Sequence, residues 1–463
     1  NRLLFASELR ALLASGLVSR WLSAAGVDSY LACGAVQSPL TIVEGIRQLL
    51  PGHYLEASIA GGLELVDVEF ARHEAQQIVR DRDEAVARLR AELEESLRLH
   101  LVSDVPLGVF LSGGMDSSAL VAMLPRITNQ RPKTFSVVFD EAKFNEAPFS
   151  RAVAERFETD HHEIRLSERE LIDLLPEAIG AIDQPTMDGI NTFVVSRAVK
   201  QSGLTVALSG LGGDELFAGY PSFRRAMRLD RLPSVSKRVL RAAAGVGKVA
   251  LNGSVQRHKF WELANSSGEP ADVYRISRQL FSSDYMTRMT GRESEPPEYS
   301  NGNHHDAINT ISQLELKGYM TNTLLRDTDA MSMAHSLEVR VPFVDRKVVD
   351  YVLSLPGEWK MDRGSRPKAL LADAVADLLP RDFMSRPKMG FTLPFEKWMQ
   401  HDLRSKISSV FHDPCLSAAG LNAGAVRKIW HDFLDKPRAV GWSRPWSLYV
   451  LAKWCERNGV TSA

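Results

Sequence analysis

The fold is decided by the stretch Val105-Pro106-Leu107-Gly108-Val109-Phe110-Leu111-Ser112-Gly113-Gly114-Met115-Asp116-Ser117-Ser118. Its apolar first half predicts a buried strand, and the residues from Ser117 to Leu124 predict a helix. The glycine pair between them lets the backbone turn sharply and approach an anion. The N–H groups of the loop and of the helix N-terminus carry partial positive charge. Strand, glycine turn and helix together predict a phosphate-binding loop.

The polar residues of this loop refine the prediction. Hydroxyl groups at Ser112, Ser117 and Ser118 can donate hydrogen bonds to phosphate oxygens. Asp116 would repel a bare phosphate, so we predict that it holds Mg²⁺. The motif does not end in Gly-Lys-Ser/Thr and is therefore not a Walker loop.

A second motif repeats this logic further along the chain. The residues from Leu208 to Tyr220 read Leu-Ser-Gly-Leu-Gly-Gly-Asp-Glu-Leu-Phe-Ala-Gly-Tyr, and Thr205 to Ser209 predict a buried strand that leads into them. Asp116 and Asp214 would then lie at the carboxyl ends of strands in one sheet, where open α/β sheets bind ligands. The two carboxylates could share Mg²⁺ with the phosphates of a nucleotide. An Asp that only caps the following helix is the alternative reading of this turn.

Alternating strand and helix patterns surround the two motifs. Asp81 to His100 predicts an amphipathic helix, Phe135 to Phe139 a strand, Ala147 to Phe157 a helix, and the segment from Asp160 a further strand. This order predicts an α/β fold with a doubly wound parallel sheet covered on both faces. From Glu315 onward helical patterns dominate.

The first 75 residues differ in pattern from the rest. Turn signals at Leu50-Pro51-Gly52-His53 and at Ala60-Gly61-Gly62 precede a segment in which Val66, Val68 and Phe70 alternate with charged residues. We therefore predict a β-rich domain over residues 1–75 and a second domain over residues 76–463. This division agrees with the expectation that 463 residues exceed one ordinary core.

Composition narrows the class of protein. Hydrophobic residues make up 44 % and charged residues 24 %, as in soluble globular enzymes. The 56 Lys and Arg residues nearly balance the 57 Asp and Glu residues, which gives a formal net charge of −1 and argues against a nucleic-acid partner. Three widely spaced cysteines and the absence of an apolar run of about 20 residues predict a reducing, cytoplasmic location without a membrane partner.

With its motifs in view, the sequence resembles the synthetase domain of the asparagine synthetase (glutamine-hydrolysing) family. Two further stretches match that family: Arg326 to Asp345, and Arg386-Pro387-Lys388-Met389-Gly390-Phe391. The first motif also resembles the pyrophosphate loop of N-type ATP pyrophosphatases. The resemblance implies a doubly wound sheet of that kind (adenine nucleotide α hydrolase-like) with a helical C-terminal part. It also implies that residues 1–75 are the end of an N-terminal-nucleophile glutaminase domain.

The resemblance assigns roles to individual residues. Asp116, Asp214 and Lys388 would be catalytic, with Asp116 and Asp214 as Mg²⁺ ligands and Lys388 on the departing pyrophosphate. ATP and pyrophosphate would be bound by Leu111, Ser112, Gly113, Gly114, Asp116, Ser117, Ser118, Val137, Ser209, Gly210, Lys368 and Lys388. A lysine suits a leaving group that gathers negative charge in the transition state.

The third stretch supplies residues for the substrate. Arg326, Asp329, Glu338 and Arg340 would form a charged network near the substrate, with a structural salt-bridge cluster as the alternative. The implied activity is ATP-dependent amide formation in asparagine biosynthesis. A carboxylic acid, aspartate first, is adenylated, and ammonia then displaces AMP.

One position departs from the family. The residue three before the second-motif Asp is usually Glu, but here it is Leu211, which cannot accept a proton or pair with an ammonium ion. Either a nearby acid such as Glu215 or Asp183 substitutes, or the acceptor is not aspartate. Alternatives are a lactam-forming relative, an amidotransferase acting on a sugar acid of surface polysaccharides, or a non-catalytic nucleotide-binding homologue.

The start of the sequence bears on the source of ammonia. The chain begins at Asn1, which is not an N-terminal cysteine nucleophile, and Cys33 is internal. We expect further residues before Asn1, and we expect residues 1–463 as they stand to use free ammonia rather than to hydrolyse glutamine. In the full-length protein ammonia would come from glutamine. The protein could assemble as a homodimer, and the sequence leaves this question open.

Overall fold

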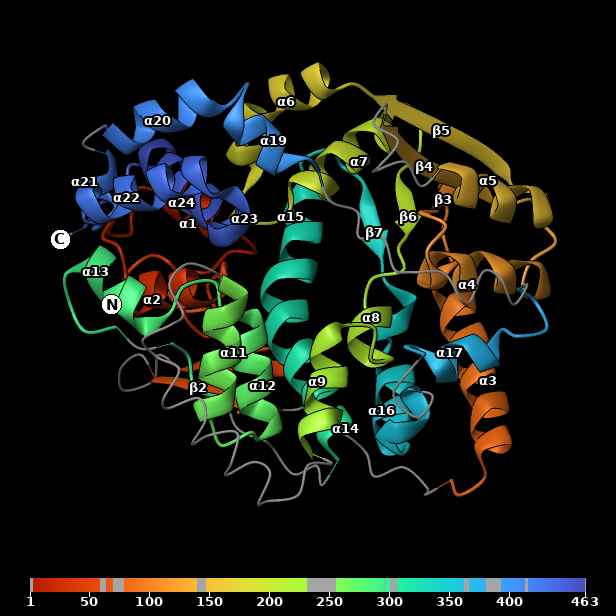
Figure 1. Ribbon diagram of the computed structural model, residues 1–463. Coiled ribbons are helices and arrows are strands. Elements are labelled where there is room, and N and C mark those ends of the chain that lie inside the picture. Colours follow the sequence, from red (N-terminus) through yellow and green to blue (C-terminus); the bar gives the residue numbers. More distant parts are fainter. Residues whose placement is uncertain are drawn as a thin grey trace.

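A five-stranded parallel sheet lies at the centre of one half of the molecule (Figure 1). A computed structural model of the chain describes residues 3–58, 64–69, 79–139, 147–230, 255–294, 296–299, 306–361, 366–379, 393–412 and 415–462. Within them the strands lie side by side in the order β5 (Asp160–Leu166), β4 (Lys133–Phe139), β3 (Leu107–Phe110), β6 (Val206–Leu208) and β7 (Glu338–Arg340). All four pairings are parallel, which confirms the predicted parallel α/β sheet.

The order of the strands sets the position of the two motifs. Strand β3 precedes the first motif and β6 precedes the second, and the two strands are direct neighbours, with Val109 opposite Leu208. Since parallel strands end at the same edge of a sheet, the two loops must meet there. Strand β7 was not predicted, because it lies in a stretch whose sequence pattern predicts helices. It is only three residues long, and its identity as a strand depends on pairing with β6.

Helices cover both faces of the sheet. Along β3, Val109 and Leu111 pack on one face while Phe110 packs on the other, as the two-residue period of a strand requires. The first face is covered by α3 (Arg82–His100), α4 (Met115–Met123), α5 (Ala147–Arg156), α16 (Arg346–Ser354) and α17 (Ala369–Ala374). Val195 and Val199 of α7 (Ile190–Gln201) cover the second face.

The helix α3 follows the predicted pattern closely. The Asp81 side chain caps it by accepting a hydrogen bond from the N–H of Glu84 at 2.8 Å. Ala85, Leu89 and Leu93 recur every four residues and are all fully buried against the sheet layer. The apolar stripe therefore fixes which side of α3 faces the core.

The second half of the molecule is helical. Helix α14 (Ala307–Glu315), the π-helical segment η4 (Leu316–Leu325) and α15 (Arg326–Met333) follow one another without a break, as the long helix near the centre of Figure 1. Within the described residues, the other helices of this half and of the region around the second motif are α1 (Leu9–Ala14), α2 (Ala24–Cys33), α6 (Glu168–Ala181), α8 (Gly213–Leu216), α9 (Pro221–Asp230), α11 (Val255–Asn265), α12 (Pro270–Arg278), α13 (Ser283–Thr290), α19 (Phe395–Gln400), α20 (Arg404–His412), α21 (Cys415–Ala418), α22 (Ala423–Asp435), α23 (Pro437–Val440) and α24 (Ser443–Asn458). Short 3₁₀ turns are η1 (Leu124–Arg126), η5 (Pro342–Val344) and η6 (Gly357–Lys360).

The N-terminal helices belong to the same core as the C-terminal ones. Leu13 of α1 and Tyr30 of α2 lie in one apolar cluster with Trp398, Trp446 and Trp454 of the C-terminal helices. Figure 1 shows these red and blue helices gathered at one side of the molecule, away from the sheet. The Tyr30 hydroxyl also donates a hydrogen bond to the carbonyl of Ser447 at 2.7 Å.

A separate antiparallel hairpin follows the N-terminal helices. It consists of β1 (His53–Ser58) and β2 (Glu64–Glu69), with Tyr54 opposite Val68. The predicted turn at Leu50 to His53 leads into β1, where the N–H of His53 donates to the carbonyl of Leu50. The turn predicted at Ala60–Gly62 and the end of the strand at Phe70 lie outside the described residues. Among the helices described, none is both long and apolar enough to cross a membrane.

Two leucines of α3 offer a matched test of this packing. Leu93→Ala should lower the free energy of unfolding by about 2–5 kcal/mol, because a fully buried side chain leaves a cavity. Leu99→Ala, at a position that is 51 % exposed on the same helix, should change it by about 0.5 kcal/mol or less. Urea unfolding followed by circular dichroism measures both. Equal losses would contradict the assigned orientation of α3.

Candidate functional site

The loop between β3 and α4 has the shape expected of an anion-binding turn. Gly113 adopts a left-handed conformation with φ of +70°, and a Cβ there would lie 2.7 Å from the backbone nitrogen of Ser150. The N–H of Gly114 donates to Ser112 Oγ at 3.2 Å, and Ser112 Oγ lies 3.1 Å from Ser117 Oγ. The loop therefore presents hydroxyl groups beside the N-terminus of α4.

Three charged side chains converge where this loop meets the second motif. Lys368 Nζ lies 2.5 Å from Asp116 Oδ2 and 2.6 Å from Asp214 Oδ1. Asp116 and Asp214 each stand in the first turn of a helix, and Lys368 directly precedes α17. The structure thus brings together the two predicted metal ligands and one of the two predicted lysines.

The charges of this cluster depend on one another. Burial alone lowers the pKa of Lys368, since it penalises the charged ammonium. The carboxylates of Asp116 and Asp214 outweigh burial and raise this pKa above its ordinary value. The ammonium therefore stays charged and offsets part of the negative charge of the pair.

Glycines of the second motif make this approach possible. A Cβ on Gly210 would lie 2.9 Å from the backbone nitrogen of Ser117, and one on Gly213 would overlap the carboxylate of Asp116. Side chains at these positions would push the two motifs apart. The glycines of the second motif are therefore required because larger residues would collide with the first motif, and not only because the backbone turns there.

The predicted nucleotide contacts lie along the same edge of the sheet. Leu111 is buried, and its N–H donates to the carbonyl of Phe135 on β4 at 2.8 Å. Val137 is half-buried on β4. The N–H of Ser209 donates to the carbonyl of Arg340 at 2.8 Å, which ties the second motif to β7. Lys388 and its whole motif lie outside the described residues.

Two carboxylates that meet one cation fit a magnesium site. Mg²⁺ is commonly held by one or two carboxylates together with substrate phosphates and water. Among the described residues there is no group of three or more His, Cys, Asp and Glu side chains that could hold a metal ion alone. Asp116 and Asp214 would share such an ion with phosphate oxygens and water.

A buried polar network backs the second motif. Glu215 Oε1 accepts a hydrogen bond from the Tyr220 hydroxyl at 2.5 Å, and Arg278 lies over the Tyr220 ring at 4.5 Å and over the Tyr319 ring at 3.7 Å. Arg278 also pairs with the fully buried Glu315 at 2.6 Å. Burial, assisted by the charge of Asp214 and opposed by the Tyr220 hydrogen bond, raises the pKa of Glu215 to about 7. Of this network, the sequence patterns singled out only Glu215 as a candidate.

The other predicted substrate residues fall into two places. Asp183 Oδ1 accepts from the N–H of Arg10 at 3.0 Å, and Arg326 Nη1 donates to the carbonyl of Val36 at 3.0 Å, so both contact the N-terminal segment. Asp329 is exposed on α15 close behind Arg326. Partial desolvation, assisted by the charge of Glu8, raises the pKa of this carboxyl even though its side chain reaches the surface.

Glu338 and Arg340 pair with each other on β7. The distance between Arg340 Nε and Glu338 Oε1 is 2.6 Å, and Arg340 Nη1 donates to the carbonyls of His100 and Val102 at 2.7 Å each. These contacts hold β7 to the end of α3. A substrate role for the two residues stays a prediction.

Asp327 is a residue that the sequence patterns missed. It is buried at the start of α15 and accepts a hydrogen bond from Thr186 Oγ1 at 2.6 Å. Burial raises its pKa to about 7, although Arg326 and Thr186 oppose that change. The sequence analysis selected its neighbours Arg326 and Asp329 as substrate residues instead. Charge alone does not show which of three ionisable residues on one helix points inward.

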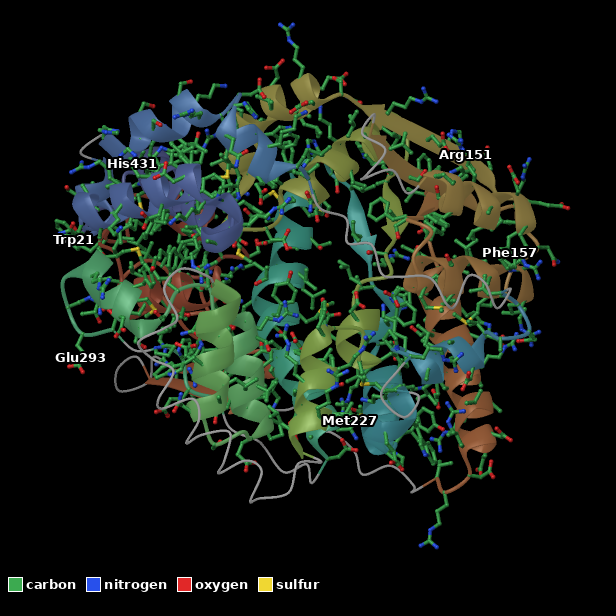
Figure 2. All side chains as sticks on the ribbon, in the orientation of Figure 1. Trp21, Arg151, Phe157, Met227, Glu293 and His431 are labelled. Atoms are coloured by element: carbon green, nitrogen blue, oxygen red, sulfur yellow. The ribbon has the colours of Figure 1, made fainter. Side chains whose placement is uncertain are left out.

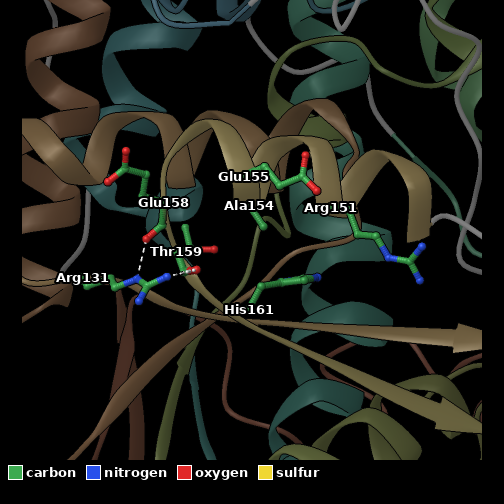
Figure 3. A pocket seen from close by; sticks show the side chains of 7 residues that line it. All are labelled: Arg131, Arg151, Ala154, Glu155, Glu158, Thr159 and His161. Atoms are coloured by element: carbon green, nitrogen blue, oxygen red, sulfur yellow. Dashed lines mark hydrogen bonds between the residues drawn. The ribbon is translucent and has the colours of Figure 1, made fainter.

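A cavity of about 640 Å³ lies elsewhere, between α5 and the edge strand β5 (Figure 3). It is lined by Arg131, Arg151, Ala154, Glu155, Glu158, Thr159 and His161. Arg131 donates to the carbonyls of Glu158 and Thr159, and Arg151 pairs with Glu163, so both cations are engaged. Figure 2 places Arg151 on the α5 side of the molecule, opposite Trp21 and His431. The cavity contains none of the three converging charges.

Comparison with known proteins identifies the family to which this chain belongs. The fold belongs to the α/β class that binds ligands at the carboxyl ends of parallel strands, where two glycine loops present acids beside Lys368. The sequence profile of the asparagine synthase family matches residues 88–456, and that of a glutamine amidotransferase domain matches residues 1–65. The chain belongs to the asparagine synthase family, which includes glutamine-hydrolysing carbon–nitrogen ligases that use ATP.

Individual relatives agree with this assignment. Asparagine synthetase [glutamine-hydrolyzing] 1 of Bacillus subtilis (strain 168) is 27 % identical over 93 % of this chain and 68 % of its own length. The corresponding enzyme 3 of the same organism is 30 % identical over 88 % of this chain and 66 % of its own length. A putative asparagine synthetase of Mycobacterium bovis is 30 % identical over 81 % of this chain and 58 % of its own length. The chain thus spans about two thirds or less of the length of these relatives.

Replacing Gly213 should separate the two motifs. In Gly213→Ala the new Cβ would overlap the carboxylate of Asp116, so we expect ATP binding to weaken at least about tenfold while the protein remains folded. Isothermal titration calorimetry with ATP and Mg²⁺ measures this change. Gly424→Ala serves as the control, because a Cβ there meets only the side-chain oxygen of Asn422, at 3.2 Å. Unchanged binding in Gly213→Ala would contradict the close approach.

Asp327 should make stability depend on pH. Its folded-state pKa of about 7 lies above the unfolded value of about 3.9, so the folded protein binds more protons between these limits. The stability that protonated Asp327 contributes is complete below pH 4 and is lost as pH rises through 7, by at most ~1.4 kcal/mol per pH unit.

Asp327→Asn should flatten this decline. Urea midpoints at pH 5, 6, 7 and 8 compare the variant with the natural chain and with Asp435→Asn, a change at an exposed residue of α22. A decline of the same steepness in all three proteins would show that Asp327 is ionised throughout this range.

Proposed function

We propose that this chain is an ATP-dependent amide-forming ligase that adenylates a carboxylic acid, aspartate first among them, and transfers ammonia to it, with release of AMP and pyrophosphate. The convergence of Asp116, Asp214 and Lys368 beside the glycine loop after β3 carries the proposal. Membership of the asparagine synthase family supports the same reaction class.

The loop residues would position the nucleotide. The N-terminus of α4 and the hydroxyls of Ser112 and Ser117 would donate hydrogen bonds to phosphate oxygens. Leu111, Val137, Ser209 and Gly210, at the carboxyl ends of three neighbouring strands, would lie along the adenosine and the α-phosphate. Such positioning supplies much of the rate enhancement when a carboxylate attacks phosphorus.

The charged residues would stabilise the departing pyrophosphate. Asp116 and Asp214 would hold Mg²⁺, which when bound neutralises charge on the phosphates. Lys368 can move its ammonium from the two carboxylates toward a phosphate oxygen, and Lys388 would act on the same leaving group. Ammonia would then attack the acyl-adenylate and expel AMP.

The N-terminal residues would have a different origin from the rest. We infer a sheet of the N-type ATP pyrophosphatase kind in residues 76–463, preceded over residues 1–75 by the end of a glutaminase domain. The separate profile matches over 88–456 and 1–65 support this division. Ammonia would reach the site from glutamine in a longer protein, and free ammonium would replace it for residues 1–463.

Leu211 favours a second candidate acceptor. Its side chain can neither accept a proton nor pair with an ammonium group, and Glu215, one of the acids that could substitute, is buried and hydrogen-bonded to Tyr220. An acceptor without an amino group, such as a sugar acid, needs no such partner. Arg326 would suit its carboxylate, since its buried Nε and Nη2 atoms have no hydrogen-bond partner among the described residues. The intact Asp116, Asp214 and Lys368 argue against a non-catalytic homologue.

A screen of carboxylic acids tests the proposal. The protein is incubated with ATP, Mg²⁺ and ammonium, and AMP and amide are measured for aspartate, other amino acids and sugar acids. We expect one acid to give AMP and amide in equal amounts. ATP binding without AMP formation from any acid would contradict the ligase, and AMP formation from a sugar acid alone would replace aspartate as the acceptor.

Asp116→Asn tests the site itself. Loss of the carboxylate removes one metal ligand, so AMP formation should fall at least about 100-fold with every acid. Asp435→Asn, at an exposed position far from the sheet, should keep full activity. Retained turnover in Asp116→Asn would show that the reaction occurs elsewhere.

A further inference from the structure

The ammonium of Lys368 lies in the gap between Asp116 and Asp214. Both of its carboxylate distances are within 2.6 Å, and its side chain is 9 % exposed, against 17 % for Asp116 and 19 % for Asp214. A cation that touches both carboxylates in a largely buried gap holds the position that a shared metal ion would need.

The backbone fixes the lysine at this position. Lys368 has φ of +57° and ψ of +30°, the left-handed region that few residues other than glycine adopt. Its carbonyl accepts a hydrogen bond from the N–H of Ala372 in α17 at 2.9 Å, and nearby Arg366 pairs with Asp373 at 2.7 Å. Gly219 leaves room for the lysine, since a Cβ there would lie 2.5 Å from Lys368 Cε. The fold therefore directs this side chain into the gap.

A metal ion and the ammonium cannot occupy this gap together. Mg²⁺ binds oxygen at about 2.0–2.1 Å and demands nearly ideal octahedral geometry. An ammonium already 2.5 and 2.6 Å from the same two carboxylates would repel the ion and block its ligands. If the lysine leaves, its charge must find another anion, because an unpaired buried charge is costly. Phosphate oxygens of a bound nucleotide are suitable partners.

We propose that Lys368 occupies the metal position of the nucleotide-free protein and so restricts divalent-cation binding at Asp116 and Asp214 to the nucleotide complex. This inference rests on the proposed function in one respect, that the two aspartates are metal ligands. It adds an order of events: the polyphosphate draws the ammonium away, and the metal ion enters with the nucleotide. The lysine also keeps two like charges close together before any substrate binds.

Binding of Mn²⁺ without nucleotide tests the proposal directly. Mn²⁺ accepts the same oxygen ligands as Mg²⁺ and is detected by electron paramagnetic resonance. The natural chain should bind it weakly at this site. Lys368→Met, which removes the charge and keeps the length of the side chain, should bind it at least about tenfold more tightly. Lys368→Arg should resemble the natural chain because the cation remains.

The location of the gained site is tested by a second change. Lys368→Met combined with Asp116→Asn should lose the gained Mn²⁺ binding. If Lys368→Met does not fold, Lys368→Gln, which also removes the charge, takes its place. No gain in Mn²⁺ affinity in a folded, uncharged variant would overturn the proposal, as would a gain that survives Asp116→Asn.

Titration with ATP present separates this inference from the proposed function. The natural chain should bind Mn²⁺ tightly once ATP is added, whereas without ATP it should not. Tight binding with ATP together with no gain in Lys368→Met would overturn only the role of the lysine. Absence of Mn²⁺ binding by the natural chain both with and without ATP would overturn the metal site and the lysine proposal together.

Discussion

Charge balance between Asp116, Asp214 and Lys368 is the constraint on which the rest of the site depends. The sheet brings the two carboxylates together because β3 and β6 are neighbours and end at one edge. Like charges so close would repel each other in a partly buried gap, and one ammonium within 2.6 Å of both offsets that repulsion. The parallel topology thus creates an electrostatic requirement that the chain meets with Lys368, which directly precedes α17 and lies 154 positions beyond Asp214 (368 − 214).

The same requirement explains the glycines. A cation can bridge two acids only if the loops that hold them approach closely, and a Cβ at Gly213 or Gly219 would overlap one of the carboxylates. The glycine-rich character of the second motif thus reflects space for neighbouring side chains as much as the turn itself. A glycine loop that only turned the chain would tolerate alanine at any position with an ordinary φ.

The sequence predicted the parts of the fold that depend on local pattern. The stripe of Ala85, Leu89 and Leu93 identified α3, and the apolar runs before each glycine loop identified β3 and β6. The meeting of Asp116 and Asp214 followed from the rule that parallel strands end together. The left-handed conformation of Lys368 and the burial of Asp327 could not be predicted in this way, because contacts with residues far along the chain decide both.

Hydrogen bonds join the N-terminal segment to the long central helix and to the loop before α7. The N–H of Ser38 donates to Asn322 Oδ1 at 2.8 Å, Arg326 donates to the carbonyl of Val36, and the N–H of Met187 donates to the carbonyl of Gly34 at 2.9 Å. These bonds tie a segment that matches the amidotransferase profile to η4, to α15 and to the loop before α7, all of which lie within the synthase profile. Within the π-helical segment η4, Asn322 Nδ2 donates to the carbonyls of Lys317 and Gly318. The N-terminal segment and the central helix therefore share a partly buried polar interface.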